Sequence, residues 1–383
     1  MSTSAVSSVV RLLSELIALP SVNPAFRPAG DPFAGEARMS DYIAARGARE
    51  GLAVEFQDVQ PGRRNVLLRY VPAERVSTRV LLAPHLDTVG SLDGSNEIFS
   101  PMTRGGRVWG RGACDTKGSV AAMLEALFAT VRGARRPRAT EIVFAGLVDE
   151  ECCQLGSRAL VGSGFRADLA IVGEPTRLAV VTAHKGDVWA RLETRGKAAH
   201  GATPDRGRNA VREMARAVEL LEGPYAARLR RRSHRLLGHP TINVGKITGG
   251  SQPNIVPDRC EIEVDRRTIP GETEQGAKRE MLAFLRSHGV RVNLADIKGL
   301  PAPPLQTDVR HPLVREFMSA MGQAKGVGVH YFCDAAILAA GGIPSVVFGP
   351  GDIAQAHTAR EWISVASLER GTALLQRFLA RLP

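Results

Sequence analysis

The feature that most limits the fold of this chain is the alternation of short apolar runs with helical patterns. Apolar runs bounded by Pro, Gly or Asp indicate buried strands, and four of them occupy residues 80–83, 142–147, 169–172 and 346–348. Apolar residues at helical spacing predict amphipathic helices at 8–19, 35–50, 119–131 and 365–382. Strands that alternate with helices predict an α/β fold, in which helices cover both faces of a largely parallel or mixed sheet.

The middle third of the chain has a different order of elements. Strand patterns lie at 188–194, 241–247, 259–267 and 290–295, and helical patterns lie at 207–221 and 272–288. The resulting order, β-α-β-β-α-β, is typical of a ferredoxin-like unit that folds by itself. We therefore predict a domain at residues 184–296, inserted into an α/β domain made of residues 1–183 and 297–383.

Length and composition exclude several classes of protein. With 383 residues, of which 44% are hydrophobic and 23% charged, the chain is long enough for two or three globular domains at about 150 residues each. No run approaches the roughly 18 apolar residues of a membrane helix, and the first residues lack a signal-peptide pattern, so we expect a cytoplasmic protein. The five cysteines are odd in number and form no CxxC pair, which argues against disulfides and against a Cys-type zinc site.

The charge of the chain is positive, with 50 Lys and Arg against 39 Asp and Glu and a formal net charge of +11. The densest basic run, at 228–235, has no aromatic platform or known nucleic-acid module beside it. We therefore interpret this run as a solvated surface and expect no nucleic-acid partner. The positive charge instead favours encounters with small anionic substrates.

Polar side chains follow the predicted strands, at the points where ligand sites form in open α/β sheets. His85 and Asp87 come directly after the first run, and carboxylates follow the second and the third. A glycine-punctuated loop carries one more carboxylate ahead of a helix, and a late loop carries a histidine. Each residue also has an ordinary interpretation, such as a helix cap at Asp115, a turn acid at Glu174 or a solvated acidic loop at 149–151.

Taken together, these residues form a mixed set of imidazoles and carboxylates that suits zinc, and also manganese or cobalt. Two metal ions about 3.5 to 4 Å apart can share one bridging carboxylate, and each ion then has about three protein ligands and one open position. Glu150 is left as a spare carboxylate for proton transfer. Asp87 can orient the imidazole of His85, because both side chains point the same way on an extended strand. The candidate ligands are His85, Asp115, Glu151, Glu174 and His357.

These motifs occur in the order found in a known family, from the stretch at 21–24 through His357. The chain resembles the metal-dependent deacylases and carboxypeptidases that include acetylornithine deacetylase, succinyl-diaminopimelate desuccinylase, aminoacylase and carboxypeptidase G. The resemblance covers nearly the whole chain. It implies a zinc-exopeptidase-like mixed sheet sandwiched by helices, with an inserted ferredoxin-like lid that commonly mediates a homodimer.

The same resemblance implies a role for each metal ligand. His85 and Glu174 would hold one ion, whereas Glu151 and His357 would hold the other. Asp115 would bridge the two ions, which are most often zinc in the family and can be cobalt or manganese.

Further roles implied by the resemblance concern catalysis and substrate binding. Asp87 would brace the first histidine ligand, and Glu150 would be the general base. In the lid, His200 matches the histidine that contacts the substrate carbonyl oxygen, often across a dimer. Asn254 and Arg267 match positions that bind the substrate carboxylate or the backbone near it, although a turn asparagine and a surface arginine are their ordinary interpretations.

The implied reaction is removal of the acyl group from an N-acyl amino acid, by attack of a water that bridges the two metal ions. Lys185 and the stretch at 351–357 resemble acetylornithine deacetylases, whereas Cys333 and Arg360 depart from the family pattern. A dipeptidase or carboxypeptidase on the same scaffold stays open, because a short peptide and an acyl amino acid present the same amide beside a free carboxylate. From another class, a non-hydrolytic ligand-binding paralogue stays open, although it would have no need of a spare base at Glu150.

Overall fold

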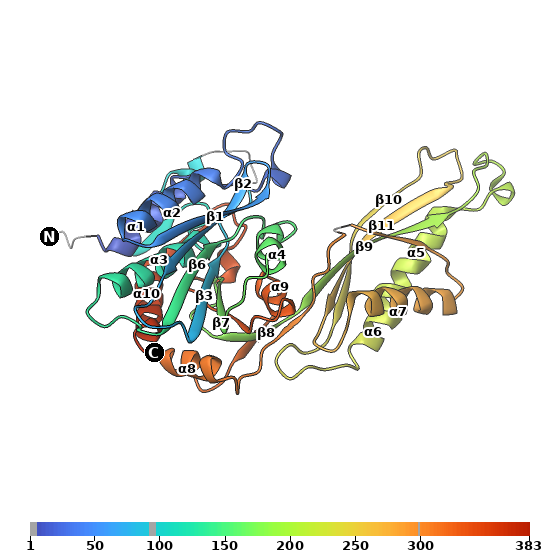
Figure 1. The fold of residues 1–383 in the computed structure, drawn as a ribbon. Helices are drawn as coiled ribbons and strands as arrows, with labels where there is room; N and C mark the ends of the chain where they lie inside the picture. Colours follow the sequence, from blue (N-terminus) through green and yellow to red (C-terminus); the bar gives the residue numbers. More distant parts are fainter. Residues whose placement is uncertain (1–5, 92–96, 298) are drawn as a thin grey trace. The chain divides into compact units, whose positions relative to one another are not determined.

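Four parallel strands form the centre of a mixed sheet (Figure 1). In sheet order they are β6 (Thr140–Gly146), β3 (Thr78–Pro84), β7 (Leu169–Gly173) and β15 (Ser345–Val347). Antiparallel strands extend the sheet on both sides, namely β2 (Arg63–Tyr70) and β1 (Ala53–Gln60) beyond β6, and β8 (Val181–His184) beside β15. The predicted α/β fold with a mixed sheet is confirmed.

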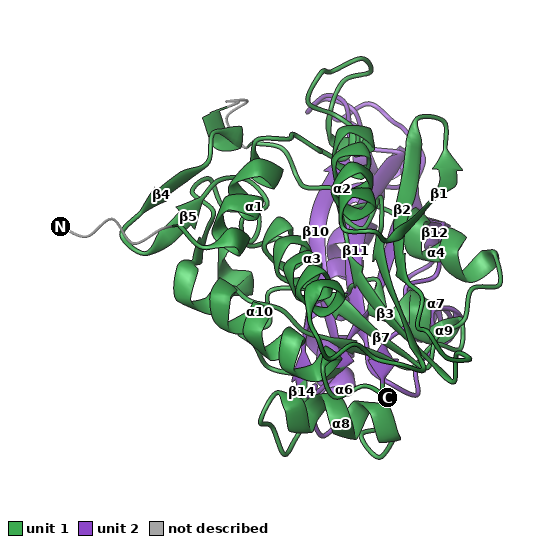
Figure 2. Ribbon diagram, turned by 60° about the vertical axis from the view of Figure 1, so that its left-hand side comes forward, with its two compact units in different colours: residues 1–182, 307–327, 333–383 green, residues 183–306, 328–332 purple. Residues whose placement is uncertain are grey.

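The structure is a computed structural model that describes residues 6–91, 97–297 and 299–383, and the chain divides into two units (Figure 2). The first unit comprises Met1–Thr182, Thr307–Val327 and Cys333–Pro383, and the second comprises Ala183–Gln306 and Gly328–Phe332. The second unit overlaps the predicted insertion at 184–296 and extends beyond it. One reason for the longer unit is that β13 (Leu305–Gln306) pairs with the last two residues of β8.

Helices cover both faces of the central sheet. One face shares a hydrophobic core with α1 (Ser8–Ile17), α2 (Ala37–Arg49), α3 (Lys117–Arg132), α8 (Pro312–Ala320) and α10 (Val365–Leu379). On the opposite face, α4 (Leu155–Gly162) and α9 (Ala335–Ala340) contact each other. Val80 and Leu82 of β3 belong to the first core, and the residue between them is also buried. Burial on both faces explains the continuous apolar runs in the sequence. None of the described helices is both long and apolar enough to cross a membrane.

A small antiparallel sheet joins two segments that are far apart in the sequence. It consists of β4 (Met102–Arg104), β5 (Arg107–Trp109) and β16 (Trp362–Ser364), with β5 in the middle. Trp109 and Trp362 are partners in this sheet. The pairing therefore brings the glycine-punctuated loop at 110–118, which follows β5, next to the segment that follows His357.

The second unit contains a four-stranded antiparallel sheet in the order β10-β11-β9-β12. Its strands are β9 (Gly186–Arg195), β10 (Thr241–Gly249), β11 (Arg259–Thr268) and β12 (Asn293–Asp296). Helices α5 (Ala210–Leu220) and α7 (Glu274–Ser287) share a hydrophobic core with this sheet. Along the chain the main elements follow the order β-α-β-β-α-β, with the short helix α6 (Ala226–Leu229) after α5.

The basic run at 228–235 begins in α6 of this unit. Arg228 forms an ion pair with Glu280, with Nε and Oε1 3.2 Å apart. Arg232 contacts the carboxylates of both Glu280 and Glu272. Acidic residues of the same unit therefore neutralise part of this charge.

Candidate metal centre

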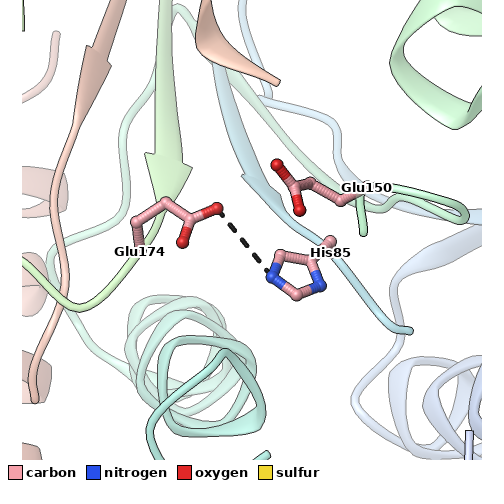
Figure 3. A group of neighbouring side chains, drawn as sticks. All are labelled: His85, Glu150 and Glu174. Carbon is pink, nitrogen blue, oxygen red and sulfur yellow. Dashed lines mark ion pairs between the residues drawn. The ribbon is translucent and has the colours of Figure 1, made fainter. Parts of the chain in front are cut away.

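The parallel strands end at one edge of the central sheet, and several candidate site residues follow those ends, whereas Asp115 lies in the loop between β5 and α3. His85 follows β3, and its backbone forms a bridge with Leu147, just after β6. The turn with Glu150 and Glu151 comes next after β6, and Glu174 follows β7 (Figure 3). Neighbouring parallel strands place their carboxyl ends side by side, so residues far apart in the sequence meet at this edge.

A first group of possible ligands contains His85, Glu150 and Glu174 (Figure 3). One ligand atom from each residue lies within 4.8 Å of the others. His85 Nε2 is 3.8 Å from Glu174 Oε1. The structure thus places the predicted spare carboxylate beside the first pair of predicted ligands.

A second group contains Asp115, Glu151 and His357, again with ligand atoms within 4.8 Å of one another. His357 Nε2 is 3.0 Å from Glu151 Oε2. The side chain of His357 is 54% exposed, whereas that of Glu151 is only 6% exposed. This group therefore has one side that solvent can reach.

Asp115 lies between the two groups. Its Oδ1 atom is 3.1 Å from His85 Nε2, and its Oδ2 atom is 3.5 Å from His357 Nε2. One carboxylate thus faces both imidazoles with a different oxygen. This is the arrangement that a shared ligand of two metal ions requires.

The electrostatics of the site favour a bound cation. Burial raises the pKa of Glu150 well above its usual value, and the neighbouring carboxylate of Glu174 adds to the effect. Burial likewise raises the pKa of Glu174, and Asp115 contributes. In addition, Glu174 Oε1 is buried and has no hydrogen-bond partner among the described residues. A group of buried carboxylates with an unsatisfied oxygen fits divalent metal ions, which would compensate the clustered negative charge.

The tautomer of His85 is set by its backbone surroundings. Its Nδ1 atom is 2.9 Å from the carbonyl oxygen of Asp87, which can only accept, so Nδ1 carries the hydrogen. Burial lowers the pKa of this imidazole, but contacts with Asp115 and Asp87 outweigh burial, and the net pKa is raised well above its usual value. In the neutral form Nε2 is left bare toward the carboxylates, as a metal ligand requires.

The carboxylate of Asp87 does more than the predicted bracing of His85. Its Oδ1 atom is 3.6 Å from His85 Nδ1, farther than the backbone oxygen of the same residue. The carboxylate accepts the backbone N–H groups of Glu150 and Glu151, both at 3.0 Å, and the side-chain amide of Asn23 at 2.8 Å. Asp87 therefore holds the turn that carries two candidate site residues.

Two residues that support this turn were not singled out as site residues from the sequence. Asn23 donates to the carboxylates of both Asp87 and Asp149. Arg63 donates to Asp149 at 2.8 Å and also pairs with the buried carboxylate of Glu36. Asp149 has a φ of 70°, so its backbone conformation needs such support. Asn23 lies in the stretch at 21–24 that carries the family resemblance, but its contacts with Asp87 and Asp149, like that of Arg63 with Asp149, join segments more than 60 residues apart and could not be read from local pattern.

A further buried carboxylate near the site is that of Asp334, which precedes α9. It accepts the hydroxyl of Ser157, and burial raises its pKa to about 7. Its negative charge is one of the causes that raise the pKa of Glu150 and of Glu174. The sequence marked this residue only by its unusual neighbour, Cys333.

The three predicted residues of the inserted region lie in the second unit. His200 and Asn254 are exposed and near each other, because the N–H of Gly201 donates to the carbonyl of Asn254 at 2.7 Å. Arg267 lies at the end of β11 and pairs with Asp265, with Nε and Oδ1 2.8 Å apart. The structure brings the first two together, and the substrate roles of all three stay predictions.

Comparisons with known proteins agree with this geometry. The family model of peptidase family M20/M25/M40 matches residues 81–381. An acetylornithine deacetylase of Myxococcus xanthus is 33% identical over 378 residues, which cover 96% of each chain.

Solved structures share the fold. A tripeptidase of Staphylococcus aureus has a TM-score of 0.79 at 21% identity, covering 97% of this chain and 98% of that chain. A dinuclear metal-binding peptidase of the M20 family from Bacillus subtilis has a TM-score of 0.70 at 14% identity, covering 97% and 96%. The match of the family model and the identity over nearly the full length establish that this chain belongs to peptidase family M20/M25/M40, and that it is a hydrolase of amide bonds.

Proposed function

We propose that this protein removes the acyl group from an N-acyl amino acid at a centre that holds two divalent metal ions, zinc in the first instance. The observation that carries the proposal is the position of Asp115, whose two carboxylate oxygens face His85 and His357 separately. The acyl amino acid is proposed because the similar protein of Myxococcus xanthus is an acetylornithine deacetylase.

Each side chain has a defined part in the proposed centre. His85 and Glu174 would hold one ion, Glu151 and His357 would hold the other, and Asp115 would be shared. Metal ions bound there would polarise the amide carbonyl and make water more acidic. The protein supplies the fixed tautomer of His85 and the buried surroundings in which the carboxylates stay close together.

Glu150 is the proposed general base. It belongs to the first group of side chains, and its backbone N–H is held by Asp87. Its carboxylate would take a proton from the attacking water and then give it to the leaving nitrogen. Burial and neighbouring carboxylates raise its pKa, which makes its carboxylate a stronger base than one in water.

Three residues of the second unit complete the proposal. His200 would stabilise the negative charge that develops on the carbonyl oxygen of the substrate. Asn254 and Arg267 would bind its free carboxylate, and the net positive charge of the chain favours such anionic substrates. A homodimer formed through this unit is part of the same proposal.

The test is a hydrolysis screen of the protein after chelation and after reloading with zinc, cobalt or manganese. The substrates are acetyl, succinyl and formyl amino acids, with di- and tripeptides as the second arm. We expect metal-dependent release of free amino acid from one acyl series and much slower cleavage of peptides. Faster cleavage of peptides would overturn the deacylase assignment in favour of a dipeptidase or carboxypeptidase, and ligand binding without turnover would indicate a non-hydrolytic paralogue.

A further inference from the structure

Glu361 is a buried carboxylate that no step of the proposed reaction uses. It lies four residues after His357, directly before β16, and only 3% of its surface is exposed. Its nearest charged partner is Arg111, whose Nη1 atom is 2.9 Å from Oε2. A buried ion pair of this kind adds little to stability by itself, so its position calls for another explanation.

The carboxylate of Glu361 accepts hydrogen bonds from the loop that carries Asp115. Oε2 accepts the backbone N–H of Gly112 at 2.9 Å. Oε1 accepts the N–H groups of Cys114 at 2.8 Å and of Asp115 at 2.9 Å. One side chain therefore satisfies three backbone donors of a loop almost 250 residues away in the sequence.

The backbone of Glu361 contacts the same loop. Its carbonyl oxygen accepts the N–H of Gly110 at 3.1 Å. Of the six residues from Gly110 to Asp115, four thus donate their N–H group to Glu361. The loop is closely packed at Gly112, whose φ is +80°, because a Cβ atom there would lie 2.9 to 3.0 Å from side-chain atoms of Lys117 and Thr88.

Glu361 also links the two segments that carry Asp115 and His357. The segment before it presents His357 to Asp115 and Glu151, and the strand after it pairs with β5, which leads into the Asp115 loop. A shift of this residue would move the shared ligand relative to both imidazoles.

We infer that Glu361 is a positioning residue, whose carboxylate fixes the Asp115 loop so that Asp115 can serve two metal ions at once. The inference rests on the proposed metal centre. Removal of the acceptor leaves three buried N–H groups without a partner, and the loop must then move to satisfy them. Supporting groups that hold a metal ligand in place typically affect metal affinity by about 10- to 100-fold when they are lost.

The experiment compares Glu361→Gln with Glu141→Gln. Glu141 is also a buried carboxylate, paired with Arg69 and Arg79, but it lies at the start of β6, at the other end of the strand from the site. A glutamine at position 361 keeps the shape of the side chain but replaces one carboxylate oxygen by an NH₂ group. That group would face the backbone N–H donors of the loop or the guanidinium of Arg111. The control, Glu141→Gln, therefore shows the effect of losing the charge of a buried carboxylate that does not contact the Asp115 loop.

Three measurements decide the outcome, namely metal affinity by titration of the chelated protein, backbone hydrogen exchange without metal, and kcat at saturating metal. For Glu361→Gln we expect affinity for both ions to fall about 10- to 100-fold, exchange to become faster at Gly112, Cys114 and Asp115, and kcat to fall. For Glu141→Gln we expect wild-type metal affinity, even if its melting temperature is lowered.

A second variant, Glu361→Asp, keeps the charge but withdraws the acceptor from the loop. We expect it to lose metal affinity as well, because the hydrogen bonds and not the charge alone hold the loop. Wild-type metal affinity in both Glu361 variants, with any drop in melting temperature like that of Glu141→Gln, would overturn the inference and leave the proposed function standing. A wild-type protein that binds no metal would instead overturn the proposed centre, and this inference with it.

Discussion

In both units burial favours the uncharged form of an ionisable side chain, but the first unit gathers several carboxylates in one place, whereas the second unit buries the isolated imidazole of His184. In the first unit, burial and like charges raise the pKa of Glu150 and Glu174 well above the usual value of a carboxyl group. In the second unit, burial lowers the pKa of His184 to about 4, so this imidazole stays neutral. The difference teaches that a bound cation stabilises a buried cluster of like negative charges, whereas a single buried base is stable in its uncharged form.

The surroundings of His184 explain why it carries no charge. Its ring packs edge-on against Phe332, and Nδ1 donates to the carbonyl of Lys185 at 2.8 Å. Nε2 has no hydrogen-bond partner in the part of the chain that the structure describes. No carboxylate is among the causes that shift its pKa, in contrast to His85.

The largest effect is expected for Glu150→Gln. This variant should lose turnover by about 100- to 10,000-fold, the usual range for a general base, because an amide cannot take the proton of the attacking water. Metal content, measured by elemental analysis, should stay near the wild-type value. A variant that keeps most of the wild-type kcat would refute the role of Glu150 and would weaken the contrast between the two units.

The next effect concerns the metal ligands. His85→Ala or Glu174→Ala should each cost one of the two bound metal equivalents, because both side chains belong to the first group. His184→Ala serves as the control, since it removes a buried imidazole of the second unit and should leave metal content unchanged. Equal metal content in all three variants would count against the assigned ligands.

Removal of metal should make the stability of the folded protein depend on the protonation of the carboxylate cluster. The folded protein raises the pKa of Glu174 above the value of 4.5, so the folded state binds the proton more tightly than the unfolded state. Stability of the chelated protein should therefore fall as the pH rises from 4.5 toward neutral. Glu174→Gln should flatten this slope in thermal unfolding, whereas Glu263→Gln, at a half-exposed site of the second unit, should leave it as in the wild type.

The second unit should show the opposite slope through His184. With a pKa of about 4 in the folded state and 6.5 as the reference, the unfolded state binds the proton more tightly. Stability is complete above pH 6.5 and should fall by about 3 kcal/mol as the pH drops through 4, at about 1.4 kcal/mol per pKa unit. His184→Asn should remove this loss in unfolding curves recorded between pH 4 and 7. An unchanged acid slope would show that other groups cause it.

The smallest effect is expected on the surface of the second unit. Glu263 pairs with Arg191 at 3.1 Å and with Lys246 at 3.5 Å. Exposed ion pairs contribute at most about 1 kcal/mol, and salt screens them. Glu263→Gln should therefore change denaturant unfolding little at low salt and less at high salt. A loss of unfolding free energy in Glu263→Gln that exceeds the change in acid stability caused by His184→Asn would contradict the contrast between buried and surface charges.

Much of the fold could be predicted because local patterns encode it. The apolar run at 142–147 became β6, buried along its whole length, since a strand covered on both faces needs no polar residues. The helical spacing at 8–19 likewise corresponds to α1, whose apolar residues are buried. Boundaries differ by a few residues, because caps and turns depend on neighbours that the pattern does not contain.

Part of the candidate site could be predicted for the same reason. His85 and Glu174 directly follow strand runs, and parallel strands present their ends at one edge of the sheet. Asp87 shows where this reasoning stops. Alternation along a strand placed its carboxylate toward His85, and Oδ1 does lie 3.6 Å from Nδ1, but the backbone oxygen makes the shorter contact and the carboxylate also accepts the N–H groups of Glu150 and Glu151.

The sequence by itself determined the strands, the helices and the kinds of side chain that stand at the strand ends, because periodicity and turn residues act over a few positions. The tertiary structure alone decided that Asp115 faces two imidazoles, that Asn23 and Arg63 support the acidic turn, and that Glu361 holds the Asp115 loop. The physical reason is distance along the chain. These contacts depend on hydrogen bonds between segments that become neighbours only when the sheet and its helices have packed.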